Sequence, residues 1–118
     1  MYHGNGDNAD STPLAVVYPR SCALALFAVT LGERITGAIE TRLQHGDFAL
    51  GAMLDAAASE GAELAAAELE SAYADHLWYK GTPTLATCLM RFSPGYCGWH
   101  TSGQKKLFEH LRPGDIGI

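Results

Sequence analysis

Apolar residues recur at every fourth position in the stretch from residue 33 to residue 46. Ile35, Ile39 and Leu43 share this spacing, and Gly46 follows where a helix C-cap belongs. A spacing close to the 3.6-residue helical turn puts these side chains on one face of a helix. The pattern therefore predicts an amphipathic helix that ends at Gly46.

An alanine-rich segment predicts the longest helix of the chain, over residues 48–77. Asp47 precedes it as a plausible N-cap. Alanine is the strongest helix former and dominates residues 56–72. Small residues on one stripe of this helix would let another backbone come close, and Gly61 marks a bend or a tight contact. The stripe consists of Leu50, Leu54, Ala57, Gly61 and Leu64.

Two apolar runs, at residues 22–31 and 84–91, show no helical period. A short continuous apolar run that ends at a glycine, as the first does at Gly32, is typical of a buried strand, although the pattern alone leaves a buried helix open. The expected fold class is therefore α/β (α+β). In this fold a small sheet formed by the two runs packs on the long alanine-rich helix over residues 48–77.

The ends of the chain carry weaker patterns. Residues 1–13 are rich in Gly, Asn, Asp and Ser and predict a flexible tail, and Pro19 allows the short run around it at most an edge strand. Near the other end, Thr101 and Gln104 stand in capping-box positions and predict a helix over residues 101–111. Its apolar face would consist of Leu107, Phe108 and Leu111.

Length and charge narrow the classes of function. The chain has 118 residues, which predicts one domain over residues 14–118 after the tail. Its net charge is −5 and it has no basic run, so binding to nucleic acid or to an anionic membrane through a basic face is not expected. The odd number of cysteines, three, argues against a disulfide scaffold. With no secretory signal pattern and no bilayer-length apolar run, the expected location is the cytoplasm.

The segment RFSPGYCGWH, residues 91–100, concentrates groups that recognise ligands. Arg91 can fork onto a carboxylate or phosphate, and Tyr96 offers an aromatic face with one hydroxyl. Ser93 adds a small donor and acceptor, and Gly95 permits a positive φ and close approach of the backbone to a ligand. Such a set suits a small ligand with a carboxylate at one end and a flat heterocycle at the other. The alternative is a tight turn whose arginine pairs with a nearby acidic residue.

Cys97 and His100 form a Cys-x-x-His pair, a spacing that occurs in zinc sites. The pair could alternatively provide a nucleophilic thiol, with His100 or His110 as its base. A second ligand pair at suitable spacing is missing from the sequence, and no third residue that would orient the base can be named. We therefore interpret Cys97 as a thiol packed beside Trp99, and we expect neither a metal site nor a catalytic acid or base.

The loop RFSPGYCGW and the following QKKLFEHLRPGDIGI resemble the activation (reactivation) domain of vitamin-B12-dependent methionine synthase and its free-standing relatives. The family pattern is an arginine, a variable residue, a small residue and then Pro-Gly-Tyr, often with Cys-Gly-Trp in the free-standing members. FAVTLG and GDFALGAMLDAAASEGAE also resemble the strand and the long helix of the family. The resemblance covers residues 22–118 and is most specific at residues 91–111.

The resemblance implies a module that binds S-adenosylmethionine and assists reductive methylation of the cobalt in a corrinoid-dependent methyltransferase. The matching ligand residues are Arg91, Ser93, Gly95 and Tyr96, with Glu63 on the long helix as the glutamate that would attract the positive charge of the ligand. Cobalamin would be carried by a partner, which is methionine synthase or another corrinoid-binding protein, and a flavodoxin-like protein would donate electrons. The protein would then be an accessory module rather than a stand-alone enzyme.

The chain departs from the family pattern in three ways. The stretch before Arg91, TLATCLM, lacks the acidic ligand residue of the full enzyme. A further ligand aspartate belongs to an N-terminal part of the family domain, and more sheet and helix belong to a C-terminal part, so the chain matches only the central part. These departures favour the alternative of a non-catalytic interaction or scaffold protein of the same fold. Uncovered apolar surface would also favour a homo-oligomer.

Overall fold

The computed structural model describes residue 21 and residues 23–116, and the chain divides into two compact units. Unit 1 comprises the described parts of Met1–Ala28 and Met90–Gly117, and unit 2 is built from Val29–Leu89. The flexible tail expected at residues 1–13 and the edge strand expected near Pro19 lie outside the described residues. The single domain expected over residues 14–118 stays a prediction.

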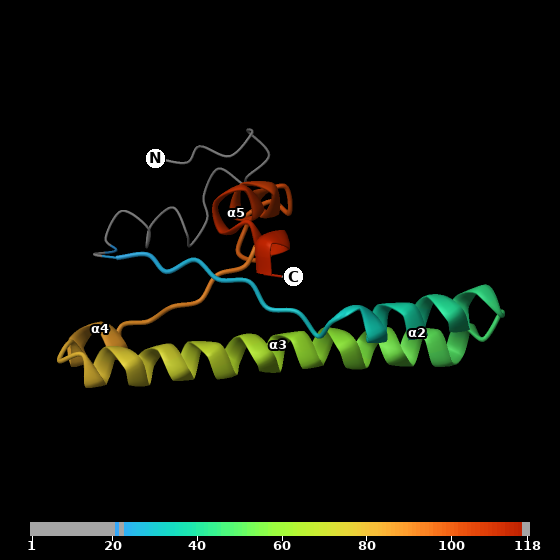
Figure 1. Cartoon of the computed structure of the whole chain (residues 1–118), viewed down its shortest axis with the longest axis horizontal. Helices are drawn as coiled ribbons and strands as arrows, with labels where there is room; N and C mark the ends of the chain where they lie inside the picture. Colours follow the sequence, from blue (N-terminus) through green and yellow to red (C-terminus); the bar gives the residue numbers. More distant parts are fainter. Residues whose placement is uncertain (1–20, 22, 117–118) are drawn as a thin grey trace. The chain divides into compact units, whose positions relative to one another are not determined.

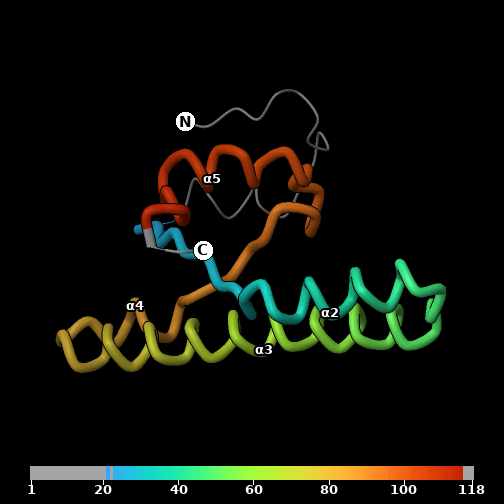
Figure 2. The backbone as a smooth tube through the Cα atoms, turned by 45° about the vertical axis from the view of Figure 1, so that its right-hand side comes forward, coloured from blue at the N-terminus to red at the C-terminus, as the bar shows by residue number. Residues whose placement is uncertain are grey.

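Unit 2 is a helical hairpin with a short third helix. Helix α2 (Glu33–Gln44) runs back along the first half of α3 (Phe48–Tyr79), and the short α4 (Pro83–Thr87) packs against the other end of α3 (Figure 1; Figure 2). Both long helices occur where the sequence predicts them, which confirms the two helical assignments. Acidic Glu33 in the first turn of α2 and basic Arg42 in its last turn both complement the helix dipole.

Each long helix ends in the same backbone motif around a glycine. After α2, the Asp47 amide donates to the Arg42 carbonyl (2.9 Å) and the Gly46 amide to the Leu43 carbonyl (3.1 Å). Gly46 has φ 78°, so it takes the left-handed position of a Schellman motif, as its predicted C-cap role requires. Gly81 repeats this geometry after α3, with φ 79°. These local signals explain why the helix ends could be predicted from the sequence.

The hairpin packs through small residues and leaves little buried apolar surface. Ala66 is the only buried hydrophobic residue in the described part of the chain. Gly51 lets α2 come close, because a Cβ there would lie 2.7 Å from the Leu43 Cδ2 atom. Gly61 makes the predicted tight contact, since a Cβ there would lie 3.0 Å from the Leu31 Cδ1 atom. The predicted apolar stripe is only partly correct, because Leu64 lies exposed.

The predicted α/β (α+β) fold class is wrong, since the described residues form helices and no strand. The run expected as a strand at residues 84–91 begins as α4, with Pro83 at its first position, where proline fits a helix start. The run at 23–31 has no regular structure, and Leu24 and Leu26 are exposed. A strand needs a hydrogen-bonded neighbour. Residues 84–91 were the expected neighbour of the first run, and helix formation at residues 83–87 removes part of that strand.

Unit 1 contains α5 (Gly103–Leu111) and the short 3-10 helix η2 (Pro113–Ile116). The predicted helix at residues 101–111 is confirmed apart from its first two residues. The predicted capping box is wrong, because the N-cap is Ser102 and no side chain caps the helix end. Here the turn before α5 satisfies the first amides: those of Gly103 and Gln104 donate to the carbonyls of His100 and Thr101.

Candidate functional site

The candidate ligand loop, residues 91–102, is closed on itself by backbone hydrogen bonds. The Gly95 amide donates to the Trp99 carbonyl (2.6 Å), and the Trp99 amide donates to the Tyr96 carbonyl (2.9 Å). The Tyr96 amide in turn donates to the Ser93 carbonyl (3.1 Å). The segment that the sequence marks as a Pro-Gly turn is therefore a compact double turn that lies directly before α5.

Left-handed backbone lies at three of the four positions that follow Pro94. Gly95 has φ 99°, Cys97 has φ 52° and Gly98 has φ 75°. The prediction that Gly95 uses a positive φ is confirmed. Cys97 adopts the same region although its Cβ makes that conformation costly, by roughly 1–2 kcal/mol for an ordinary residue. A fixed but strained turn of this kind is typical of a segment whose surroundings determine its shape.

Trp99 anchors the loop to the start of α5. A Cβ at Gly103 would clash with the Trp99 Nε1 atom and would lie 2.7 Å from its Cε2 atom, so the indole ring lies directly on the glycine backbone. This contact was not predicted from the sequence, although the four-residue separation of the two residues is a usable signal. The Trp99 ring thus packs on the Gly103 backbone, where no side chain intervenes. The Trp99 carbonyl in turn accepts the hydrogen bond from the Gly95 amide.

Four of the five predicted ligand residues gather in this loop. Arg91 and Ser93 are half-buried, whereas Gly95 and Tyr96 are exposed, with 61% of Tyr96 open to solvent. The Tyr96 ring can therefore stack on a flat partner without any rearrangement. The Thr101 methyl group would lie 3.3 Å from a Cβ at Gly95, so a side chain there would press on the threonine.

Glu63, the fifth predicted ligand residue, belongs to unit 2. It lies exposed on α3, in the middle of the helix. Residues 83–90, which comprise α4 and the segment that leads to Arg91, contain no Asp or Glu. The set that the structure brings together in one unit therefore consists of the arginine, the serine, the glycine and the tyrosine.

Cys97 and His100 do not form part of a larger ligand cluster. Within the described residues, no group of three or more His, Cys, Asp and Glu side chains could hold a metal ion. The Nδ1 atom of His100 lies 3.0 Å from the Ser102 hydroxyl and accepts a hydrogen bond from the Ser102 amide (3.2 Å). Since this nitrogen serves the turn before α5, His100 has a structural role there. Cys97 is exposed and does not have the packed position expected for it.

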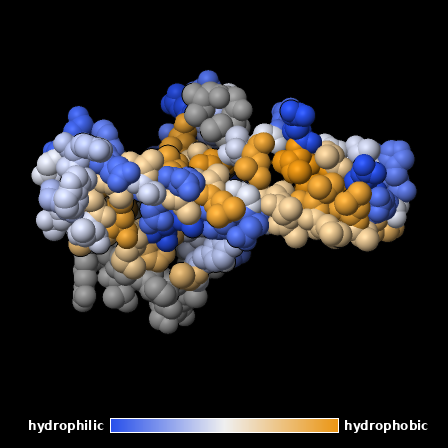
Figure 3. All heavy atoms as spheres, turned by 90° about the horizontal axis from the view of Figure 1, so that it is seen from below, coloured by the Kyte–Doolittle hydropathy of each residue, from blue (hydrophilic) through white to orange (hydrophobic). Residues whose placement is uncertain are grey.

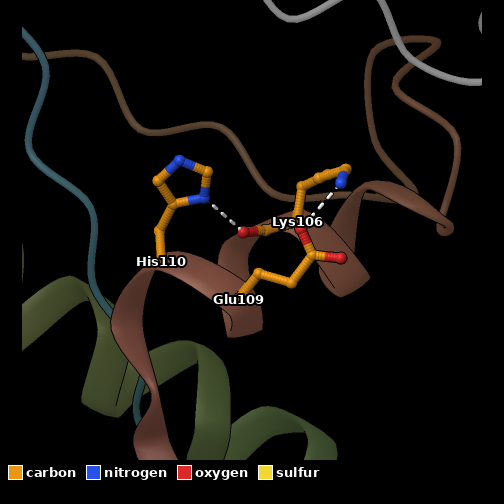
Figure 4. A network of polar contacts seen from close by, with 3 residues as sticks. All are labelled: Lys106, Glu109 and His110. Carbon is orange, nitrogen blue, oxygen red and sulfur yellow. Dashed lines mark hydrogen bonds and ion pairs between the residues drawn. The ribbon is translucent and has the colours of Figure 1, made fainter.

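The solvent side of α5 carries a small polar network (Figure 4). The ammonium of Lys106 forms an ion pair with Glu109 (2.7 Å), and the Nδ1 atom of His110 donates to the Lys106 carbonyl (2.8 Å). Surface pairs of this kind contribute up to about 1 kcal/mol. The His110 ring is therefore held along its own helix, which does not support its assignment as a base for Cys97.

None of the helices in the described part of the chain combines the length and the apolar character needed to cross a bilayer. Comparisons of the chain with protein-family models, with curated proteins and with solved structures found no match. The chemistry of the loop and of the helix surfaces is therefore what bears on function.

Proposed function

We propose that the protein is an S-adenosylmethionine-binding module that assists the reactivation of a cytoplasmic corrinoid-dependent methyltransferase. The observation that supports this proposal is the complete Arg-x-Ser-Pro-Gly-Tyr sequence in one compact turn, with Gly95 at φ 99° and Tyr96 exposed. In this role Arg91 binds the methionine carboxylate, the Gly95 backbone meets the adenosine moiety and Tyr96 stacks on the adenine. The resemblance further implies Glu63 as the residue that attracts the positive charge of the ligand, and this role stays a prediction.

The module carries no acid or base of its own in this proposal. Methyl transfer from the sulfonium to cobalt is chemistry of the two cofactors, and a protein contributes by holding the donor against the acceptor. Cobalamin is brought by a corrinoid-binding partner or methionine synthase, and a flavodoxin-like protein supplies the electron. We further propose that the protein works as a homo-oligomer, given the large apolar side chains that it exposes outside α3, among them Leu24, Met90 and Phe108.

Isothermal titration of the purified chain with S-adenosylmethionine tests this function directly. Arg91→Lys should weaken binding by about 1–2 kcal/mol, because a lysine cannot reproduce the forked contact of a guanidinium with a carboxylate. Arg34→Lys, an exposed change of the same kind on α2, is the matched control and should leave binding unchanged.

Melting curves separate a binding role of Arg91 from a structural one. If Arg91 binds the ligand, the lysine variant keeps the melting temperature of the wild type and loses most of the shift that S-adenosylmethionine induces. Equal ligand-induced shifts in the two proteins would show that Arg91 does not bind. A lower melting temperature without ligand would show that it supports the strained turn instead.

A second candidate is a non-catalytic interaction protein, and the exposed apolar surface favours it. Phe48, Met53, Leu64, Trp78 and Tyr79 are each more than half exposed along one helix. A monomeric soluble protein rarely leaves so many large apolar groups in water unless they bind something. A chain that keeps its helical structure and binds no S-adenosylmethionine at millimolar concentration would establish this candidate over the first.

A further inference from the structure

Six exposed residues lie on one side of α3, and we call them the outer strip. In a helix of 3.6 residues per turn they lie within an arc of about 100°, which also includes the half-buried Leu50 and Gly61. All six are exposed, and the exposed fractions of Met53, Leu64 and Tyr79 are 69%, 60% and 89%. The outer strip consists of Met53, Glu60, Leu64, Glu68, Asp75 and Tyr79.

The composition of α3 is that of a covered helix. Its apolar residues are spread around the whole circumference rather than gathered on one face. A helix of this kind is normally buried on all sides. Within unit 2, however, α2 and α4 are the elements that pack on it, and they leave the outer strip open. Apolar groups are visible at the surface of the hairpin end, at the right of Figure 3.

The charge of α3 indicates which partner suits this strip. The helix contains six acidic residues and neither Lys nor Arg, so its formal charge is −6. The rest of the chain has eight basic residues against seven acidic ones, and the net charge of the whole is −5. The excess negative charge of the protein is thus located on this one helix. A second copy of α3 laid against the strip would bring carboxylates opposite carboxylates, which is unfavourable.

Three of the carboxylates are spaced along the strip itself. Glu60 and Glu68 are eight residues apart, which corresponds to about 12 Å along the axis, and Asp75 follows after about 10 Å more. Leu64 lies between the first two acids and Tyr79 follows the third. A partner helix with one cationic side chain every two turns, and apolar side chains between them, would match this order of groups.

We propose that the outer strip binds an amphipathic helix of another protein, with Lys or Arg at every seventh or eighth residue and apolar side chains in between. The apolar groups of the partner cover Met53, Leu64 and Tyr79, and its cations pair with the carboxylates. In such interfaces burial of apolar area supplies affinity, and charge complementarity selects the partner and its register. This proposal is independent of S-adenosylmethionine binding.

Two labelled synthetic peptides of about 28 residues test the proposal by fluorescence anisotropy against the full chain. Both have leucine at the a and d positions of four heptads. One has lysine at e and g, which keeps it from pairing with itself, and the other has glutamate there. The chain should bind the lysine peptide at least about tenfold more tightly, and its affinity should fall between about 50 and 300 mM salt.

Charge reversal on the strip supplies the decisive comparison. The double variant Glu68→Lys/Asp75→Lys should reduce the preference for the lysine peptide at least about fivefold. The control variant Glu40→Lys/Asp55→Lys changes the net charge by the same amount at exposed positions outside the strip. It should keep the preference of the wild type for the lysine peptide. Leu64→Ala should weaken binding of the lysine peptide at least about threefold. Far-UV circular dichroism verifies that all variants keep their helix content.

Three results would overturn the proposal. One is the absence of binding to the lysine peptide at low salt, and another is equal affinity for the two peptides. The third is a wild-type dimer in sedimentation equilibrium that Leu64→Ala dissociates, because the strip would then be occupied by a second copy of this chain.

Discussion

Gly103 has no room for a side chain, although it occupies the first position of a helix. Its α-carbon supports the indole ring of Trp99, and the Trp99 carbonyl holds the Gly95 amide of the ligand loop. Alanine at a helix position usually stabilises relative to glycine, by about 1 kcal/mol. At this site the clash with an aromatic ring outweighs that gain, because a large half-buried ring cannot move aside as freely as the end of a flexible side chain.

We expect Gly103→Ala to lower the free energy of unfolding by about 1–2 kcal/mol, as overpacking does elsewhere. The change in tryptophan fluorescence on urea unfolding measures this effect. Gly114→Ala is the matched control, since a Cβ at Gly114 meets no atom within 4 Å. A Gly103→Ala protein as stable as the control would show that Trp99 does not depend on this contact.

Features of the candidate site could be predicted from the sequence where they depend on neighbouring residues alone, and not where they depend on residues distant in the sequence. The turn at Pro94 and Gly95 was predictable, because proline and glycine set backbone angles by themselves. The packed position expected for Cys97 was wrong, since packing depends on which residues surround it in three dimensions. A role of Glu63 in binding the same ligand as the loop would likewise depend on residues that are distant in the sequence, and it stays a prediction.

The helices of unit 2 could be predicted from the sequence, whereas the predicted sheet is absent from the described residues. Periodic apolar residues, a run of alanines and C-terminal glycines act within a few residues of one another, and they define α2 and α3. A strand depends on a neighbour that is distant in the sequence. The apolar runs at 22–31 and 84–91 carry no information on pairing, and with Pro83 as a helix start the second run folds locally against α3.

Replacement of glycine by alanine should have opposite effects on stability at two positions, one within α2 and one just after it. Gly37 lies inside the helix, and a Cβ there would meet no atom within 4 Å, so Gly37→Ala should stabilise the protein by about 0.5–1 kcal/mol. Gly46 also has open space but φ 78°, so Gly46→Ala should destabilise it by about 1 kcal/mol.

Urea unfolding followed by far-UV circular dichroism measures both of these changes. The comparison isolates backbone conformation, because neither substitution creates or removes a side-chain contact. If the two variants shifted stability in the same direction, the Schellman motif after α2 would not be formed in solution.

Across the part of the molecule that the structure describes, most large apolar side chains remain accessible to solvent. Within the described residues no large side chain is fully buried, and Ala66 is the only buried hydrophobic residue. The hydrophobic contribution to stability grows with the apolar area removed from water, at roughly 25 cal/mol per Å². The isolated chain is therefore expected to gain little from this source until a ligand or a partner covers its helices.

We expect the isolated protein to bind the dye ANS, because large apolar side chains are open to solvent in the described part of the chain. A partner that binds only the folded state and covers these side chains should lower the dye fluorescence and raise the melting midpoint. A wild-type protein that does not increase the fluorescence of ANS would contradict this expectation.

The acidic composition of α3 also determines how the protein can be cut. Trypsin cleaves after Lys and Arg, and the sequence has neither between Arg42 and Lys80. A complete tryptic digest therefore releases residues 43–80 as one peptide, which contains all of α3 but not Arg42, whose carbonyl accepts the Asp47 amide in the motif that precedes α3. The natural chain thus yields its own longest helix in isolation, without a new expression plasmid. An endoproteinase specific for glutamate, by contrast, divides the same helix after its four glutamates, two of which, Glu60 and Glu68, belong to the outer strip.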